Sequence, residues 1–185
     1  MNDISFDKLM QDTVNSFNKK RRLLLHCCCA PCSTSCLERL SPYFEITALF
    51  YNPNIENPEY ERRKAELIRF LNETGLADFI DCDHDTAVFY NAVKGFESCK
   101  EGGERCGKCF ELRLKKTRDA AFEKGYDYFT TTLTVSPMKD AKLINSIGER
   151  LGGTKWLYSD FKKRNGYLRS IQLSGEHSLY RQNYC

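Results

Sequence analysis

The distribution of cysteine constrains this chain more than any other feature of its sequence. Ten of its 185 residues are cysteines, at positions 27, 28, 29, 32, 36, 82, 99, 106, 109 and 185. A chain of this length buries about 70% of its unfolded surface on folding, so it needs no disulfides. Its first twenty residues are too polar for a secretory signal peptide, which predicts a cytoplasmic protein with reduced thiols. Clustered reduced thiols indicate metal binding or redox chemistry rather than a disulfide framework.

The composition is typical of a globular domain and excludes several other classes of protein. Apolar residues make up 41% of the chain and charged residues 29%, which excludes a disordered or collagen-like sequence. No apolar run approaches the roughly 20 residues that cross a bilayer, so we expect no membrane partner. The net charge of +3 is compatible with an RNA partner without requiring one.

Short apolar runs alternate along the chain with segments of helical periodicity. The apolar runs predict strands at 23–27, 44–51, 79–82, 128–133 and 155–158. The periodic segments predict helices at 5–18, from 33 onward, and at 57–74, 84–94, 107–124 and 138–151. A polar loop with several glycines leads to a C-x-x-C, and after residue 158 the pattern weakens.

This alternation predicts one α/β domain, residues 1–185, with residues 1–20 as an N-terminal helical extension. Its sheet should be mostly parallel, with about five strands and with helices on both faces. In such sheets the functional site lies beyond the carboxyl ends of the strands. We therefore expect four segments to converge on one rim, namely 27–32, 52–54, 134–139 and 160–162.

The cysteines that follow the first predicted strand could ligate zinc or an iron–sulfur cluster. Adjacent cysteines point in different directions, so Cys28 and Cys29 are better suited to two neighbouring centres than to one tetrahedral ion. A [4Fe–4S] cluster accepts thiolates from distant parts of a chain. Gathering Cys106, Cys109 and Cys185 onto the rim near Cys28 fits such a cluster better than a local zinc knuckle.

Two other classes of function also fit parts of this pattern. The chain could be a zinc-stabilised RNA-binding module without catalytic activity. Alternatively, Cys29-Ala30-Pro31-Cys32 could be the C-x-P-C of a thioredoxin-like dithiol oxidoreductase, because it follows a strand and opens a helix. The second hypothesis leaves the C-x-x-C and the terminal cysteine without a role.

Other residues near the predicted rim offer further polar groups. Lys139, Ser136 and Tyr184 are candidate proton donors by position, and His26 is either a metal ligand or a buried histidine with satisfied hydrogen bonds. Three basic runs could hold RNA phosphates or could be ordinary solvated surface, at 19–22, 115–118 and 162–164. Neither a G-x-G-x-x-G nor a Walker A motif is present, so ATP is not expected.

Six motifs occur in a fixed order along the chain. They are L-L-L-H-C-C-C-A-P-C, F-Y-N-P-N-I followed by E-Y-x-x-R, G-E-R-C-x-x-C-F-x-x-R-L, T-T-T-L-x-x-S-P-x-K, D-F-K-K-x-x-G and Y-R-Q-N-Y-C. Over residues 22–185 this series resembles the cobalamin-independent epoxyqueuosine reductases, the QueH type. Six ordered motifs make the resemblance specific.

The resemblance implies a Rossmann-like, three-layer fold similar to that of the adenine-nucleotide α-hydrolases. It implies an oxidoreductase that removes the epoxide oxygen of epoxyqueuosine in the anticodon loop of tRNA and yields queuosine, in the last step of queuosine biosynthesis. The implied cofactors are a [4Fe–4S] cluster and a second, mononuclear iron. The implied partners are the tRNA and a low-potential electron donor such as ferredoxin or flavodoxin.

Carried over residue by residue, the resemblance implies cysteine ligands in this chain but leaves their division between the two centres open. Our assignment to the cluster is Cys28, Cys106, Cys109 and Cys185. The second iron is assigned to Cys29 and Cys32.

Catalytic roles are assigned to Cys29, Cys32 and Lys139. Cys27 stands where family members often have an apolar residue, so we interpret it as a non-ligand. Family members usually continue past the final Tyr-Cys with Gly-Cys and a further helix.

Overall fold

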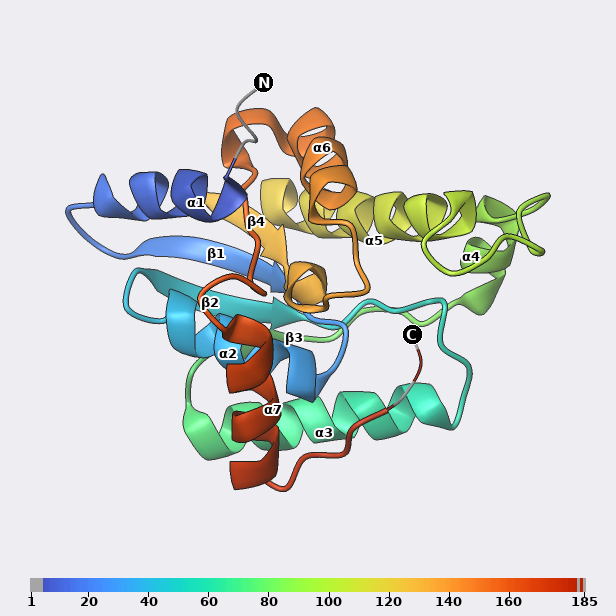
Figure 1. Cartoon of the computed structure of the whole chain (residues 1–185), viewed down its shortest axis with the longest axis horizontal. Helices are drawn as coiled ribbons and strands as arrows, with labels where there is room; N and C mark the ends of the chain where they lie inside the picture. The colour runs from blue at the N-terminus through green and yellow to red at the C-terminus, as the bar shows by residue number, and fades with distance from the viewer. Residues whose placement is uncertain (1–4, 183, 185) are drawn as a thin grey trace.

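The protein is described by a computed structural model that covers residues 5–182 and 184. Within these residues lies a four-stranded sheet made of β1 (Arg21–His26), β2 (Phe44–Leu49), β3 (Asp78–Ile80) and β4 (Tyr128–Thr131). The strands lie in the order β3-β2-β1-β4, and every neighbouring pair is parallel (Figure 1). The predicted α/β class and parallel sheet are therefore confirmed.

Helices cover both faces of this sheet (Figure 1). The core of one face is built with α1 (Phe6–Asn15), α2 (Ala30–Leu40) and α3 (Glu59–Thr74). The core of the other face is built with α5 (Glu104–Glu123) and α6 (Ala141–Gly152). The remaining α-helices of the described residues are α4 (Thr86–Ala92) and α7 (Gly166–Glu176), which packs against α2. This layering confirms the predicted Rossmann-like arrangement. In the described part of the chain, no helix is long and apolar enough to cross a membrane.

Strand β1 is central because its side chains are buried on both faces. Leu23 and Leu25 belong to the core on the α2 and α3 side, whereas Leu24 belongs to the core under α5 and α6. Each of the three is fully buried. Burying a leucine side chain stabilises a fold by about 1.5–3 kcal/mol, so this short run fixes the position of the strand that leads into the cysteines.

The predicted fifth strand at 155–158 is wrong. The structure has a 3₁₀ helix at Gly153–Lys155 and then one isolated parallel bridge between Trp156 and Phe129. The Trp156 N–H donates to Gly153 O at 3.1 Å within the 3₁₀ turn, so a neighbouring strand cannot use it. Beyond the bridge, the Asn145 side chain on α6 binds the segment. Asn145 Oδ1 accepts hydrogen bonds from Trp156 Nε1 and from the Ser159 N–H, both at 3.1 Å, and its Nδ2 donates to Ser159 O at 2.8 Å.

Helix α5 begins earlier than predicted. It starts at Glu104 rather than at residue 107, so both cysteines of the C-x-x-C lie within the helix. Gly102 has a positive φ of 85°, and Gly103 is the extended N-cap. The polar loop therefore ends at these two glycines, before the C-x-x-C begins.

Helix α7 has no counterpart in the prediction. Its outer surface leaves Leu168 61% exposed and Ile171 41% exposed, so its apolar residues do not follow one amphipathic stripe. The buried residues of α7 are Leu173 and two small residues, Ser170 and Ser174, which let α7 lie close to α2. Apolar periodicity is therefore a poor guide to this segment.

The packing between α6 and Trp156 generates a prediction. A Cβ at Gly148 would lie 2.2 Å from the Trp156 ring, whereas a Cβ at Gly175 on α7 would meet nothing within 4 Å. We expect Gly148→Ala to lower the free energy of unfolding by about 1–3 kcal/mol, measured by urea denaturation. The control Gly175→Ala should be neutral or stabilising by up to about 1 kcal/mol. Equal stability of the two variants would contradict this close packing.

Candidate active site

One buried histidine ties together the carboxyl ends of three neighbouring strands. His26 ends β1, and its Nε2–H donates to Tyr51 O, just past β2, at 3.0 Å. Its Nδ1 accepts a hydrogen bond from Thr131 Oγ1, at the end of β4, at 2.8 Å. Burial and the nearby Arg113 guanidinium lower the pKa of His26 to about 3, so the ring is neutral. Because both ring nitrogens are engaged, His26 is a buried, hydrogen-bonded histidine here.

Arg113 joins helix α5 to the same strand ends. Its side chain is buried, and Nη2 donates to Asn52 Oδ1 while Nε lies 3.4 Å from His26 Nε2. Asn52 in turn donates from Nδ2 to Cys27 O at 3.0 Å. Another guanidinium nitrogen, Nη1, lies 3.8 Å from Cys109 Sγ. Arg113 therefore fixes the C-x-x-C helix relative to the loop that follows β1.

Three thiols after β1 form a compact group. The Sγ atoms of Cys28, Cys29 and Cys32 all lie within 4.8 Å of one another, and those of Cys28 and Cys29 are 3.9 Å apart. Cys29 is the N-cap of α2, and its Sγ accepts a hydrogen bond from the Cys32 N–H at 3.3 Å. Two sulfurs bound at about 2.3 Å to a tetrahedral ion lie about 3.8 Å apart, so this spacing permits one shared ion as well as the two neighbouring centres expected from the sequence. The helix N-terminus also favours thiolates.

Electrostatics distinguish the three thiols of this group. Sulfur hydrogen bonds with Cys29 and Cys32 lower the pKa of Cys28 well below its usual range, in spite of burial. Burial, followed by the contact with Cys28, raises the pKa of Cys29, and contacts with the other two thiols raise that of Cys32. Cys28 is therefore the thiolate of the metal-free group. A raised pKa at Cys29 is the opposite of what the first thiol of a thioredoxin-like C-x-P-C needs.

Cys27 and Cys36 point into the hydrophobic core instead. Both are fully buried members of the apolar cluster on the α2 and α3 side of the sheet. Burial raises the pKa of Cys27 to about 12, so this thiol stays protonated at neutral pH.

The C-x-x-C occupies the first turns of α5. Cys106 Sγ accepts a hydrogen bond from the Gly102 N–H at 3.2 Å, and Cys109 is buried beside Arg113. Among the residues that the structure describes, the compact thiol group contains neither of these two cysteines. Cys185, assigned from the sequence as a further cluster ligand, lies outside the described residues.

A cavity of about 480 Å³ opens beside the compact thiol group, with Cys28 and Cys32 in its wall. The three candidate proton donors from the sequence also line it, namely Ser136, Lys139 and Tyr184. The side chain of Lys139 is 9% exposed, and its Nζ lies 3.3 Å from Glu101 Oε1. The fold therefore brings two thiols and the ammonium of Lys139 to the wall of one cavity.

Sequence reasoning missed Arg113 and the carboxylate of Glu101. Arg113 was within the matched C-x-x-C motif, four residues after Cys109 and flanked by the buried Phe110 and Leu114. A charged residue on the buried face of a helix is the signal that could have found it, because such a charge needs a specific partner. Glu101, in a polar loop, carried no comparable signal.

Comparison with known proteins identifies the family of this chain. Residues 23–185 match the family model described as "Epoxyqueuosine reductase QueH". The chain belongs to this family. Relatives named epoxyqueuosine reductase QueH are 41% identical in Streptococcus pyogenes serotype M1 and 40% identical in Staphylococcus epidermidis. The two alignments cover 98% of this chain, and 76% and 82% of the respective relatives. The resemblance seen in the motifs is confirmed, and the chain is an oxidoreductase of the QueH family.

The fold is also similar to a solved structure. The chain matches the U34-tRNA thiolase NcsA from Methanococcus maripaludis, which was solved with its [4Fe-4S] cluster, with a TM-score of 0.56. The match covers 97% of this chain and 65% of the other at 13% sequence identity. At this identity the likeness concerns the fold alone, and it agrees with the α/β architecture of this QueH family member.

The electrostatics of the thiol group generate a prediction. In reduced, metal-free protein, iodoacetamide should modify Cys28 before Cys29 and Cys32, because its pKa alone among the three is lowered. The Cys28 reaction should persist as the pH falls from about 8.5 to about 7, where ordinary thiols slow down. Site-resolved mass spectrometry measures the rates. Thr132→Val, which removes the hydroxyl 3.5 Å from Cys28 Sγ, should slow the reaction. Equal rates for all three thiols at neutral pH would refute this assignment.

Proposed function

We propose that this chain reduces epoxyqueuosine in the anticodon loop of tRNA to queuosine, the last step of queuosine biosynthesis. One observation carries the proposal: in a member of the QueH family, three thiols within 4.8 Å of one another lie beside a cavity at the carboxyl ends of parallel strands. The name shared by the relatives supplies the substrate and the type of reaction. The cavity supplies a place where substrate and thiol-bound metal can meet.

The donors in the site suit an iron–sulfur centre. Thiolates are the usual ligands of iron–sulfur clusters and also bind single iron ions, and the compact group brings three thiols together. The C-x-x-C comes from α5, which Arg113 fastens to the same strand ends. The cluster ligands in this proposal are Cys28, Cys106, Cys109 and Cys185, and the ligands of a second iron are Cys29 and Cys32.

The reaction consumes two electrons and two protons. Both C–O bonds of the epoxide break, a double bond forms between its carbons, and the oxygen leaves as water. When bound, the cluster and the iron would supply single electrons and a Lewis acid. A low-potential donor such as ferredoxin or flavodoxin would replace the electrons. The protein itself has to bind the nucleoside, orient the epoxide and provide protons to the oxygen.

Lys139 is the side chain in the cavity that is best suited to give a proton. Its ammonium lines the cavity and is held by the carboxylate of Glu101 at 3.3 Å. A positioned ammonium can donate to an oxygen on which negative charge develops as a C–O bond breaks. Ser136 and Tyr184 lie in the same wall and could relay the second proton.

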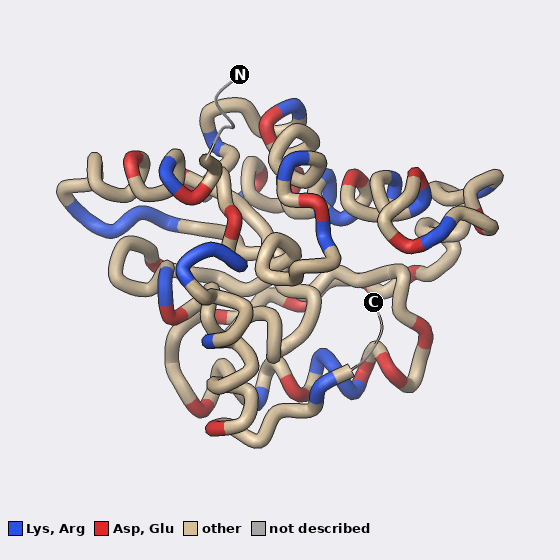
Figure 2. Tube along the Cα trace, in the orientation of Figure 1, with Lys and Arg blue, Asp and Glu red and all other residues tan. Residues whose placement is uncertain are grey.

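The basic residues near the cavity suit the approach of a tRNA loop. The run Lys162–Arg164 lies just before the N-cap of α7 (Figure 2). Tyr167 and Ser170 of α7 line the cavity. The run at 19–22 lies at the opposite end of β1, about 20 Å from the cysteines. We therefore propose phosphate contacts at 162–164 rather than at 19–22, and a cytoplasmic location where tRNA is available.

The cluster assignment predicts the effect of one substitution. Cys106→Ser should abolish both the visible absorbance of the anaerobically reconstituted protein and the reduction of epoxyqueuosine, because serine is a poor cluster ligand. Cys82→Ser is the matched control, since Cys82 lies in the loop after β3, and it should keep both properties. Iron and sulfide analysis, with chromatography of the digested tRNA, measures the outcome. A colourless Cys106→Ser variant with full activity would contradict the cluster assignment. If the wild-type protein instead contains zinc and no sulfide, that result would favour the zinc-stabilised RNA-binding module.

The role of Lys139 predicts a separate effect. Lys139→Met should lower kcat by about 100-fold or more while iron content stays unchanged, because it removes a proton donor and no ligand. Lys142→Met, on the exposed start of α6, is the control and should retain kcat. Steady-state assays at saturating tRNA measure the difference. If the Lys139→Met variant keeps the kcat of wild type, a group other than Lys139 donates the proton.

A further inference from the structure

The chain does not leave the surface after α7 but turns and runs along α3 (Figure 1). We name residues 177–182 and 184 the C-terminal strap. The turn is made at Ser178, which has a positive φ of 49°. Leu179 is then buried, and its N–H donates to Ser174 O at 2.8 Å. The strap thus starts from a defined position.

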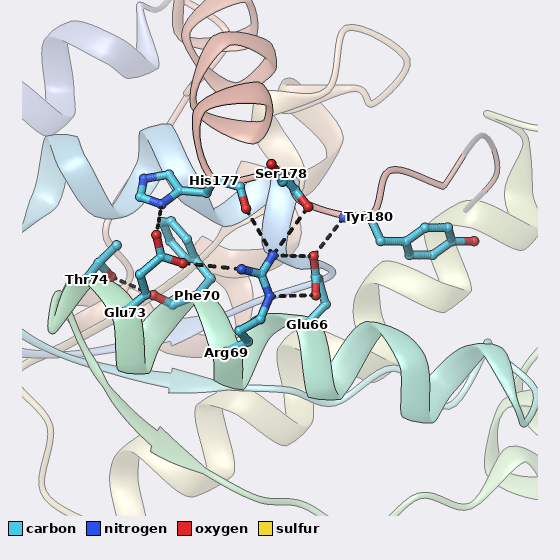
Figure 3. A network of polar contacts seen from close by, with 8 residues as sticks. All are labelled: Glu66, Arg69, Phe70, Glu73, Thr74, His177, Ser178 and Tyr180. Atoms are coloured by element: carbon cyan, nitrogen blue, oxygen red, sulfur yellow. Dashed lines mark hydrogen bonds and ion pairs between the residues drawn. The ribbon is translucent and has the colours of Figure 1, made fainter.

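Arg69 on α3 binds the first residues of the strap (Figure 3). Its Nη2 donates to the carbonyl oxygens of His177 at 3.0 Å and of Ser178 at 3.4 Å. Glu66 holds the guanidinium with two bonds, of 2.8 and 3.1 Å, and Glu73 holds it with a third at 3.3 Å. A planar guanidinium with two carboxylate partners has a fixed orientation, so its remaining bonds to the strap are directed.

The two carboxylates also contact the strap themselves. Glu66 Oε1 accepts a hydrogen bond from the Tyr180 N–H at 2.8 Å, and Glu73 Oε1 lies 2.7 Å from His177 Nδ1 (Figure 3). Glu66, Arg69 and Glu73 are three and four residues apart, so they form one stripe along α3. This stripe, which we call the clamp, engages the backbone or side chain of three strap residues.

Beyond the clamp, the strap leads into the active site. The Tyr180 ring lies 3.4 Å from the Arg62 guanidinium, and its hydroxyl donates to the Glu59 carboxylate. The residues that follow line the cavity, namely Arg181, Gln182 and Tyr184. The Gln182 side chain lies close enough to Cys29, a member of the compact thiol group, to counteract part of the rise in the pKa of that thiol.

We propose that Glu66 and Arg69 are positioning residues of the active site, which hold the C-terminal strap on α3 so that it forms one wall of the thiol-lined cavity. Neither residue lines the cavity, and both act through the strap. The wall is needed for stable metal binding, a consequence that rests on the proposed function. Arg69 is 45% exposed, and exposed ion pairs add little to global stability. Loss of the clamp should therefore free the strap without unfolding the protein.

Arg69→Met tests the clamp in the full chain, with Arg150→Met as the matched control. Arg150 makes an exposed ion pair of the same length with Glu111, at 2.8 Å, between α6 and α5. In metal-free protein we expect Arg69→Met to speed amide exchange at Leu179 and Tyr180, and alkylation of Cys29, by about tenfold or more. The melting temperature should stay close to that of wild type. Arg69→Lys keeps the positive charge but loses the planar guanidinium. Its exchange and alkylation rates should therefore lie between those of wild type and those of Arg69→Met.

After anaerobic reconstitution, Arg69→Met should lose iron about tenfold faster than wild type on dilution into a chelator. Unchanged exchange in Arg69→Met would overturn the clamp. Faster exchange with wild-type iron retention would overturn the need for the wall. If wild type does not reduce epoxyqueuosine, the proposed function fails instead, and the comparison of exchange in metal-free Arg69→Met and Arg150→Met still decides whether the clamp holds the strap.

Discussion

The buried guanidinium of Arg113 holds the two thiol-bearing parts of the site in one arrangement. It comes from α5, yet it bonds to Asn52 after β2 and lies against His26 at the end of β1. A charge with 1% exposure is costly unless its donors are bonded and its charge is offset. Asn52 contributes to the first condition. Hydrogen bonds with Cys29 and Cys32 chiefly lower the pKa of the Cys28 thiol and Arg113 lowers it further, so negative charge on that sulfur would help to offset the guanidinium.

The same interaction explains why His26 has to be neutral. A protonated imidazole beside Arg113 would place two cations in one buried space, and its pKa of about 3 prevents this at neutral pH. The neutral ring can then accept from Thr131 and donate to Tyr51 O, which ties β4 and the segment after β2 to β1. Hydrogen bonds between uncharged groups thus hold the strand ends together. The positive charge of Arg113 is left to attract the sulfur atoms.

The parts of this protein that could be predicted from sequence depend on local patterns. The leucines at 23–25 indicate a buried strand, and parallel strands bring their carboxyl ends together, so the rim position of the cysteines followed. The parts that could not be predicted depend on distant partners. The segment at Trp156 forms a single bridge and binds the Asn145 side chain on α6, and Arg113 bonds to Asn52 at a separation of 61 residues. The C-terminal strap likewise depends on α3, more than 100 residues earlier.

The charges around the cavity give the proposed reaction a consistent electrostatic basis. The walls carry several cationic side chains and one carboxylate, from Glu101, and the cations are Arg63, Arg113, Lys139 and Arg181. An RNA loop brings phosphates that these cations would attract. The epoxide oxygen gains negative charge as its C–O bonds break, and fixed cations in an enclosed site stabilise such charge more strongly than water does. In the proposed function, a chain with a net charge of only +3 can act on RNA because the lining of its cavity carries four cations and one carboxylate.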